Sequence, residues 1–275
     1  MALANQIYTK TDINYALGDD NINPRAVSIL DGRLREDLSW EENGFELISH
    51  HSAVTDWNDE STVANTYYQE MEVLAKSLTD CDHALIAGHI SRNPETAKLH
   101  ADYAPIQYAH SDFAESYGDF IRERYSDLEG EAAGRDALAR AGITAADVAR
   151  APRILVLQFW RNVGPENMDL PIAFCDAQSV ERDDLHAINV PNYADEGLPF
   201  DTLGLQGDNA QRHSWYTFPR MHAGEVVAFR TFDTACVEYE QPFWTPHSAF
   251  QDTVQENVKP RYSIEVRATC LFFSE

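Results

Sequence analysis

Beyond residue 153, one strand-like segment follows another, and turns rather than helices separate them. These segments are rich in β-branched and aromatic residues, which are typical of strands; they span residues 154–160, 170–175, 214–218, 225–232 and 262–273. A parallel doubly wound sheet needs a helix after nearly every strand, and this half of the chain lacks that alternation. We therefore predict a mainly β fold with flanking helices, whose core is a double-sheet sandwich or jelly roll.

The first half of the chain is predicted to supply most of the helices. Strand-like composition at 45–51 and 83–90 flanks the segment 59–78, in which apolar residues recur every three or four positions, as in an amphipathic helix. Further helices are expected within 112–150, which we interpret as a helical insertion between strands. Residues 1–40 are polar and contain turn signals, so we predict an irregular N-terminal segment that wraps around the outside.

The chain carries 45 acidic against 21 basic residues, a net charge of −24. Such a surface repels phosphate backbones and anionic membranes, so we expect a small-molecule substrate rather than nucleic acid or a membrane as partner. No stretch approaches the roughly 20 apolar residues of a membrane span, and the N-terminus lacks the apolar core of a secretory signal. A cytoplasmic protein is therefore expected. An anionic cosubstrate would need a local basic anchor in so acidic a chain.

The length of 275 residues is enough for one large core, so we predict a single domain over 1–275. The sequence leaves a monomer and a homodimer open. Its four cysteines are widely separated, and no Cys-X-X-Cys pair points to a zinc ribbon or a redox motif. The chain also lacks the glycine-rich signatures of dinucleotide and phosphate binding and the Gly-X-Ser-X-Gly elbow of hydrolases. Histidine and carboxylate chemistry is the main option that remains.

Two His-X-Asp pairs could each supply two metal ligands: His110 with Asp112, and His100 with Asp102. On a strand, residues two apart lie on the same face, so both side chains can grip one ion. In an acidic chain with 10 histidines such a pair also arises by chance, as a surface histidine beside a solvated acid. We favour His110 and Asp112, because they end the β-rich run 105–110, whereas His100 follows a loop-like segment.

A third ligand is expected on a later strand, and His247 is the candidate. Two histidines and one carboxylate make the facial triad that leaves adjacent positions open on iron(II). Fourteen residues further on, Arg261 and Ser263 could bind a distal carboxylate, the guanidinium with two parallel hydrogen bonds. Strand alternation places Arg267 on the same face, although for that arginine we favour a solvated pair with Glu265 slightly over a ligand role.

Taken in order, these and several further segments resemble the AsaB-type hydroxylase/desaturase family, whose members are iron(II)- and 2-oxoglutarate-dependent oxygenases of secondary metabolism. The resemblance covers nearly the whole chain and is carried by the segments 110–112, 160–161, 171–180, 215–219, 225–233, 247–250 and 260–267.

The resemblance implies a double-stranded β-helix, a cupin-like jelly roll, with Fe(II) as cofactor and 2-oxoglutarate and O2 as cosubstrates. It implies that His110, Asp112 and His247 hold the iron, and that Arg261 and Ser263, with Arg267 as a further candidate, bind 2-oxoglutarate. Succinate and CO2 are then the coproducts of a hydroxylation, a desaturation or an oxidative ring formation.

Aromatic residues near these motifs could line a substrate pocket, although each could equally be plain core. The candidates are Tyr108, Phe113, Trp160, Trp215, Phe243 and Trp244.

Two other functions remain open at this point. One is a cupin-like metalloenzyme that needs no 2-oxoglutarate, for which the Arg261–Ser263 pair would have no purpose. The other is a non-catalytic, acidic jelly-roll binding domain, for which the His-X-Asp match would be accidental. A measurement of metal binding would distinguish the non-catalytic binding domain, which needs no metal, from the two metal-dependent enzymes.

Overall fold

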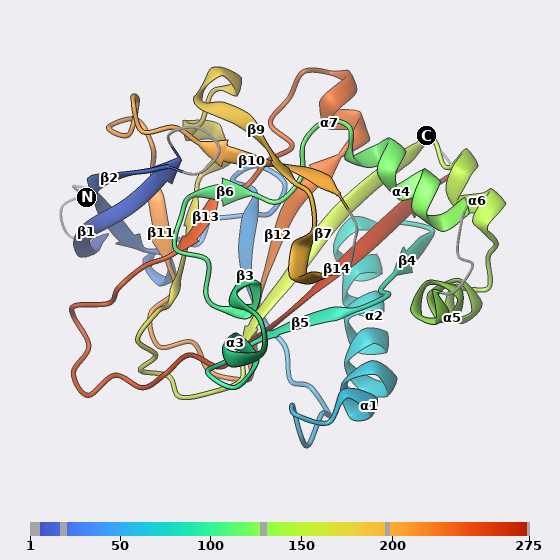
Figure 1. The fold of residues 1–275 in the computed structure, drawn as a ribbon, viewed down its shortest axis with the longest axis horizontal. Helices are drawn as coiled ribbons and strands as arrows, with labels where there is room; N and C mark the ends of the chain where they lie inside the picture. The colour runs from blue at the N-terminus through green and yellow to red at the C-terminus, as the bar shows by residue number, and fades with distance from the viewer. Residues whose placement is uncertain (1–5, 17–20, 127–130, 196–198, 274–275) are drawn as a thin grey trace.

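A computed structural model describes residues 6–16, 21–126, 131–195 and 199–273, and it consists mainly of two β-sheets that lie face to face (Figure 1). The larger sheet has eight strands in the order β1-β2-β11-β8-β13-β6-β10-β9. These are β1 (Ile7–Ala16), β2 (Ile22–Asp31), β6 (His110–Ser111), β8 (Ile172–Cys175), β9 (Leu185–Val190), β10 (Phe200–Leu205), β11 (Trp215–Thr217) and β13 (His247–Ala249).

The smaller sheet has six strands, in the order β3-β12-β7-β14-β4 with β5 also paired to β14. Its strands are β3 (Phe45–Ser49), β4 (His83–Leu85), β5 (His89–Arg92), β7 (Arg153–Asn162), β12 (Glu225–Asp233) and β14 (Ser263–Phe272). Long antiparallel pairings join β7 to both β12 and β14, so these three strands form the centre of the sheet. They correspond to predicted strands at 154–160, 225–232 and 262–273.

Aromatic side chains fill the space between the two sheets. The ring of Phe174 on β8 lies 5.4 Å from that of Phe45 on β3 and 5.1 Å from that of Phe229 on β12, measured between centroids. All three are fully buried. Since β8 belongs to the larger sheet and the other two strands to the smaller one, these contacts hold the sheets together by burial of apolar surface.

Strand alternation on β14 separates an apolar face from a polar one. Ile264 and Val266 belong to a buried cluster with Met71 of α2 (Tyr68–Thr79), so this helix covers the outside of the smaller sheet. The alternate residues Glu265 and Arg267 face the interior between the sheets, as the period of two requires. A row of polar groups therefore points into the molecule.

The helices lie around the sheets, and α4, α5 and α6 fall within the predicted insertion 112–150 (Figure 1). Residues 127–130 of that block lie outside the described residues. The helices are α1 (Glu60–Thr62), a π-helical turn (Val63–Tyr67), α2 (Tyr68–Thr79), α3 (Thr96–Leu99), α4 (Tyr117–Ser126), α5 (Ala132–Ala141), α6 (Ala145–Arg150) and α7 (Thr234–Glu238). None of the described helices is long and apolar enough to cross a membrane.

The prediction for residues 1–40 was wrong over most of its length. In the described parts, β1 and β2 pair with each other in antiparallel fashion, and β2 pairs in parallel with β11. The polar residues of β1 alternate with Ile13 and Tyr15, which are buried. A strand with one solvated face is polar at every second position, and the sequence interpretation took this pattern for an irregular segment. Residues 1–5 and 17–20 lie outside the described residues.

Candidate metal and cosubstrate site

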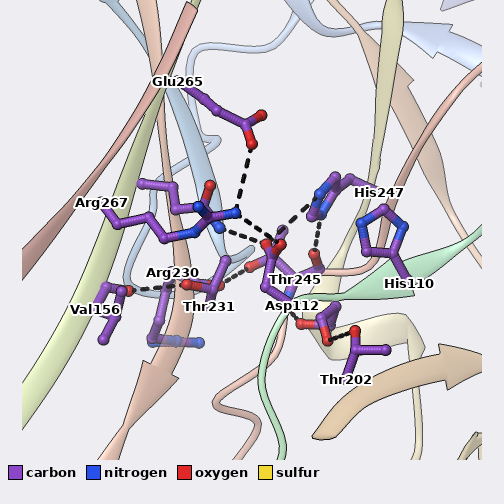
Figure 2. Close-up of polar contacts among 12 residues, drawn as sticks. His110, Asp112, Val156, Thr202, Arg230, Thr231, Thr245, His247, Glu265 and Arg267 are labelled. Atoms are coloured by element: carbon purple, nitrogen blue, oxygen red, sulfur yellow. Dashed lines mark hydrogen bonds and ion pairs between the residues drawn. The ribbon is translucent and has the colours of Figure 1, made fainter. Parts of the chain in front are cut away.

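His110, Asp112 and His247 meet at the pairing of two short strands. Strand β6 pairs with β13 so that His110 lies directly opposite His247, and Asp112 follows β6 immediately. The ligand atoms of the three side chains all lie within 4.8 Å of one another. Figure 2 shows the three side chains converging on one point. The structure thus brings together the three residues that the sequence singled out.

Backbone carbonyls fix the orientation of both imidazole rings. Nδ1 of His110 lies 2.9 Å from the carbonyl oxygen of Tyr108, and Nδ1 of His247 lies 3.0 Å from that of Thr245. A carbonyl oxygen only accepts, so each Nδ1 carries the proton and donates it, which leaves Nε2 with its lone pair for a metal. His247 Nε2 lies 3.7 Å from an oxygen of Asp112.

The charges of the three groups suit a divalent cation. Burial, and after it the neighbouring His247, lower the pKa of His110 to about 4. For Asp112, burial alone would raise the pKa, but the electrostatic attraction of His247 and Arg267 outweighs it and lowers the pKa to about 2. The site therefore offers a neutral imidazole and an ionised carboxylate at neutral pH, the protonation states that metal binding requires. The donor set fits iron(II).

The alternative pair, His100 and Asp102, forms no such site. Asp102 accepts a hydrogen bond from the backbone N–H of Ala194, and its other neighbour is His100 at 3.5 Å. Both side chains are about a third exposed, at 31% and 38%. Among the described residues, the only group of three or more potential ligand side chains close enough to hold a metal is the one at His110. The preference for the strand-borne pair is therefore supported by the geometry.

A buried chain of alternating charges continues from Asp112 into the smaller sheet. Gln158 on β7 donates to one oxygen of Asp112, and Arg267 lies 3.4 Å from the other. Arg267 also lies 3.4 Å from Glu265, which in turn pairs with Arg92 at 3.2 Å. Figure 2 shows Arg267 between the two carboxylates. Sequence reasoning named Arg267 and Glu265 but missed Gln158, although a single glutamine inside an apolar strand was a usable signal.

Arg261 forms no ion pair with these charged groups, and its side chain has no carboxylate partner among the described residues. It is 4% exposed, donates to the carbonyl oxygen of Leu170 at 3.0 Å, and its guanidinium lies 5.6 Å from the centre of the Trp160 ring. Burial lowers the pKa of Arg261 to about 9, and the neighbouring cation Arg92 acts in the same direction, against the attraction of Glu265 and Asp169. Arg261 Nε, Ser263 Oγ and Trp160 Nε1 are buried and find no hydrogen-bond partner among the described residues.

Such a cluster of unmet donors around a buried cation fits a bound carboxylate. An unpartnered buried polar group costs stability, and one carboxylate supplies enough acceptor sites to satisfy these donors. Arg261 and Ser263 therefore remain the candidates for the basic anchor that an acidic chain needs for an anionic cosubstrate.

A cavity with a volume of about 310 Å³ opens beside the triad, with His110, Asp112 and Arg267 in its wall. Of the six aromatic candidates for substrate contact, Tyr108 and Phe113 line this cavity. Trp160, Trp215, Phe243 and Trp244 do not. They are buried in the hydrophobic clusters, which corrects the substrate-binding prediction for these four.

Contacts with neighbouring side chains hold three of these four aromatic residues in the core. Trp215, for example, donates to the hydroxyl of Tyr15 at 2.9 Å and so belongs to the larger sheet's own core. Phe243 and Trp244 pack against each other with ring centroids 5.2 Å apart. Arg261 and Ser263 are likewise absent from the cavity wall.

The chain is similar to several fungal oxygenases. It is 25% identical over 273 residues to the "Alpha-ketoglutarate-dependent dioxygenase phiK" of a fungal species, covering 95% of this chain and 89% of that protein. It is 28% identical over 273 residues to the "Hydroxylase/desaturase efuI" of Hormonema carpetanum, covering 92% of this chain and 85% of that protein. The name of the second relative confirms the resemblance to hydroxylase/desaturase enzymes.

A solved structure and a family profile cover almost the entire chain. The iron and alpha-ketoglutarate-dependent endoperoxidase NvfI superposes with a TM-score of 0.77 at 20% identity, over 98% of this chain and 99% of the other. This match confirms the predicted jelly-roll fold. The profile of a family described as "Oxidoreductase/YMDC permease-like domain" matches residues 5–271, and the chain belongs to that family.

Proposed function

We propose that this protein is an Fe(II)/2-oxoglutarate-dependent dioxygenase that oxidises a small-molecule secondary metabolite. The reaction is a hydroxylation, a desaturation or an oxidative ring formation, with succinate and CO2 as coproducts. The observation that carries the proposal is the convergence of His110, Asp112 and His247, with ligand atoms within 4.8 Å. Support also comes from the relatives, of which one is named an alpha-ketoglutarate-dependent dioxygenase.

The proposed roles follow from the contacts of each side chain. His110 and His247 would bind iron through Nε2, since their Nδ1 atoms are held by carbonyl oxygens. Asp112 would supply the anionic ligand, and Gln158 and Arg267 hold its carboxylate in place. Iron(II) in this position supplies the chelation of a 2-oxo acid and the activation of O2.

Arg261 and Ser263 are proposed to hold the distal carboxylate of 2-oxoglutarate. Arg261 is the better candidate than Arg267, because Arg267 already lies 3.4 Å from two carboxylates. The side chain of Arg261 forms no ion pair among the described residues, and the Nε atoms of both arginines lack a hydrogen-bond partner there. Binding there would satisfy a buried cation, and fixing the far end of the cosubstrate leaves its 2-oxo acid end free to face the triad.

We also propose that residues 1–275 act as one domain and that the protein works in the cytoplasm. The free state of all four cysteines supports the second point, since disulfides are rare in a reducing compartment.

Anaerobic titration with Fe(II), followed by 2-oxoglutarate, tests the proposal. Wild-type protein is expected to bind one equivalent of iron and then to develop the visible charge-transfer absorption of an Fe(II) 2-oxo acid chelate. His110→Ala and His247→Ala should lose both. His100→Ala is the matched control, because it removes the histidine of the other His-X-Asp pair and should keep both. Iron binding that survives in the first two variants would contradict the assigned ligands.

A further inference from the structure

One face of α4 forms a wall of the cavity beside the triad. Tyr117, Phe120, Ile121 and Arg124 all line the cavity. Their spacing of three, four and seven residues is that of a single helix face. The helix begins at Tyr117, five residues after Asp112, and the ring of Tyr117 stacks on that of Phe113 with centroids 3.5 Å apart and planes 9° from parallel. The wall therefore runs from the triad outward along the helix.

Aromatic rings cover most of this wall. The ring of Phe120 stacks against Tyr117 at 5.2 Å. Tyr193, in the connection between β9 and β10, and Phe200, the first residue of β10, also line the cavity. Aliphatic side chains such as Ile90 lie among the remaining lining residues. Flat aromatic faces favour a flat ligand, because offset stacking needs parallel planes. The body of the substrate should therefore be planar and apolar.

The cavity is basic, although the protein is strongly acidic. Three arginines, Arg92, Arg124 and Arg267, line it, and Asp112 is the only carboxylate residue among the described lining residues. Arg92 and Arg267 are balanced by Glu265 and Asp112 in the buried chain of charges. Arg124 forms no ion pair with any of these buried charged groups.

The partner of Arg124 can be displaced at little cost. Its Nε lies 3.3 Å from Glu131, and the two side chains are 36% and 32% exposed. An ion pair that is so exposed contributes little, because water screens it and two long side chains must be held in one geometry. A ligand carboxylate arriving from the cavity can therefore replace Glu131 and form a charge-assisted hydrogen bond with the guanidinium.

We propose that the substrate is a planar, two- or three-ring molecule with one carboxylate, and that Arg124 binds this carboxylate in place of Glu131. The length follows from the helix: Tyr117 and Arg124 are seven residues apart, which is about 10 Å along the axis. A molecule of that length places its far end beside the triad. This inference rests on the proposed function, since it assigns the orientation of that enzyme's substrate.

Binding of two naphthalene probes tests the proposal. 2-Naphthoate carries the carboxylate and 2-naphthamide is its neutral counterpart of the same shape. Equilibrium dialysis under argon, with the Fe(II)-loaded protein saturated with 2-oxoglutarate, keeps the metal site and Arg261 occupied. Wild-type protein is expected to bind the acid about tenfold or more tightly than the amide.

Variants of the Arg124–Glu131 ion pair test whether Arg124 causes the preference for the acid. Arg124→Gln should abolish the preference for the acid, and Glu131→Gln should increase it by removing the competing carboxylate. Arg150→Gln is the matched control, because Arg150 is also a helix arginine paired with a carboxylate, Asp147, but does not line the cavity. It should leave the preference unchanged.

Three results would overturn the proposal: no binding of 2-naphthoate to wild type, equal binding of acid and amide, or an unchanged preference in Arg124→Gln. Failure of the proposed function has a different signature. In that case the same samples bind neither iron nor 2-oxoglutarate, and the ratio of the two probes, measured with the metal-free protein, still reports on Arg124.

Discussion

Replacing Arg261 by methionine should separate cosubstrate binding from iron binding. Methionine keeps an unbranched apolar stem beside Trp160 but removes the cation and its donors. Among the described residues, the side chain of Arg261 contacts Leu170 and Trp160 rather than the triad. Affinity for iron should therefore remain, whereas affinity for 2-oxoglutarate should fall.

The magnitude follows from the hydrogen bonds that are lost. Each hydrogen bond between a guanidinium and a carboxylate contributes about 1.5–3 kcal/mol. Two such bonds give at least about 3 kcal/mol, which corresponds to a dissociation constant raised roughly 100-fold or more. The folded apoprotein should lose little, because replacement of a buried charge by an apolar side chain is often neutral or stabilising. We expect its unfolding free energy to change by no more than about 1 kcal/mol.

Calorimetry under argon on the Fe(II)-loaded protein measures the dissociation constant, and urea unfolding of the apoprotein measures stability. Tyr262→Phe is the neighbouring control, because the Tyr262 hydroxyl reaches outward to Glu95 and should not matter for the cosubstrate. A dissociation constant of Arg261→Met within about a factor of three of wild type, roughly 0.6 kcal/mol, would refute the assignment. If Arg267→Gln then loses 2-oxoglutarate instead, Arg267 is the anchor.

Three further predictions follow from buried groups. Gln158→Leu removes a hydrogen-bond donor to Asp112. The affinity for iron should fall about 10- to 100-fold in an anaerobic titration. An unchanged affinity would show that Asp112 does not need this hydrogen bond. Phe45→Ala removes a fully buried ring between the sheets and should lower the unfolding free energy by about 3–5 kcal/mol in urea; a loss below about 1 kcal/mol would contradict the packing described for this position. Burial lowers the pKa of His213, and this effect outweighs the opposing attraction of Asp184. As the pH falls, His213 is therefore protonated in the unfolded chain before it is protonated in the folded one. The free energy of unfolding should then decrease as the pH drops below about 6.5. His213→Gln should reduce this loss between pH 7.5 and 5.5, and an equal loss in both proteins would rule out the contribution.

Strands with a strong pattern could be predicted from sequence, and strands with a weak one could not. The central strands β7, β12 and β14 are apolar over most of their length, because both faces are covered. In contrast, β1 and β2 have a solvated face and little apolar contrast, so only their pairing with the rest of the sheet reveals them. Propensity is a weak guide where cross-strand contacts decide the structure.

In the candidate site too, residues with a local sequence pattern could be predicted and long-range contacts could not. Spacing and strand context identified His110 and Asp112, and alternation placed Glu265 and Arg267 on one face of a strand. The contact between Gln158 and Asp112 joins residues 46 positions apart and has no local signature beyond one polar residue in an apolar run. The helix face of α4 did carry a periodic signal, but sequence alone could not say that this face borders a cavity rather than a core.

A protein with a net charge of −24 can still bind an anion, because its surface charges and its buried cations act over different distances. Charges spread over the surface act over about 8–10 Å at physiological ionic strength and are screened by salt. Buried cations are screened much less, and the guanidinium of Arg261, which is 4% exposed, forms no ion pair among the described residues. The acidic surface therefore slows the approach of any dianion, while the interior determines how strongly it is held. The same separation applies at Arg124, where the local competitor is a single exposed carboxylate, Glu131, rather than the charge of the whole protein.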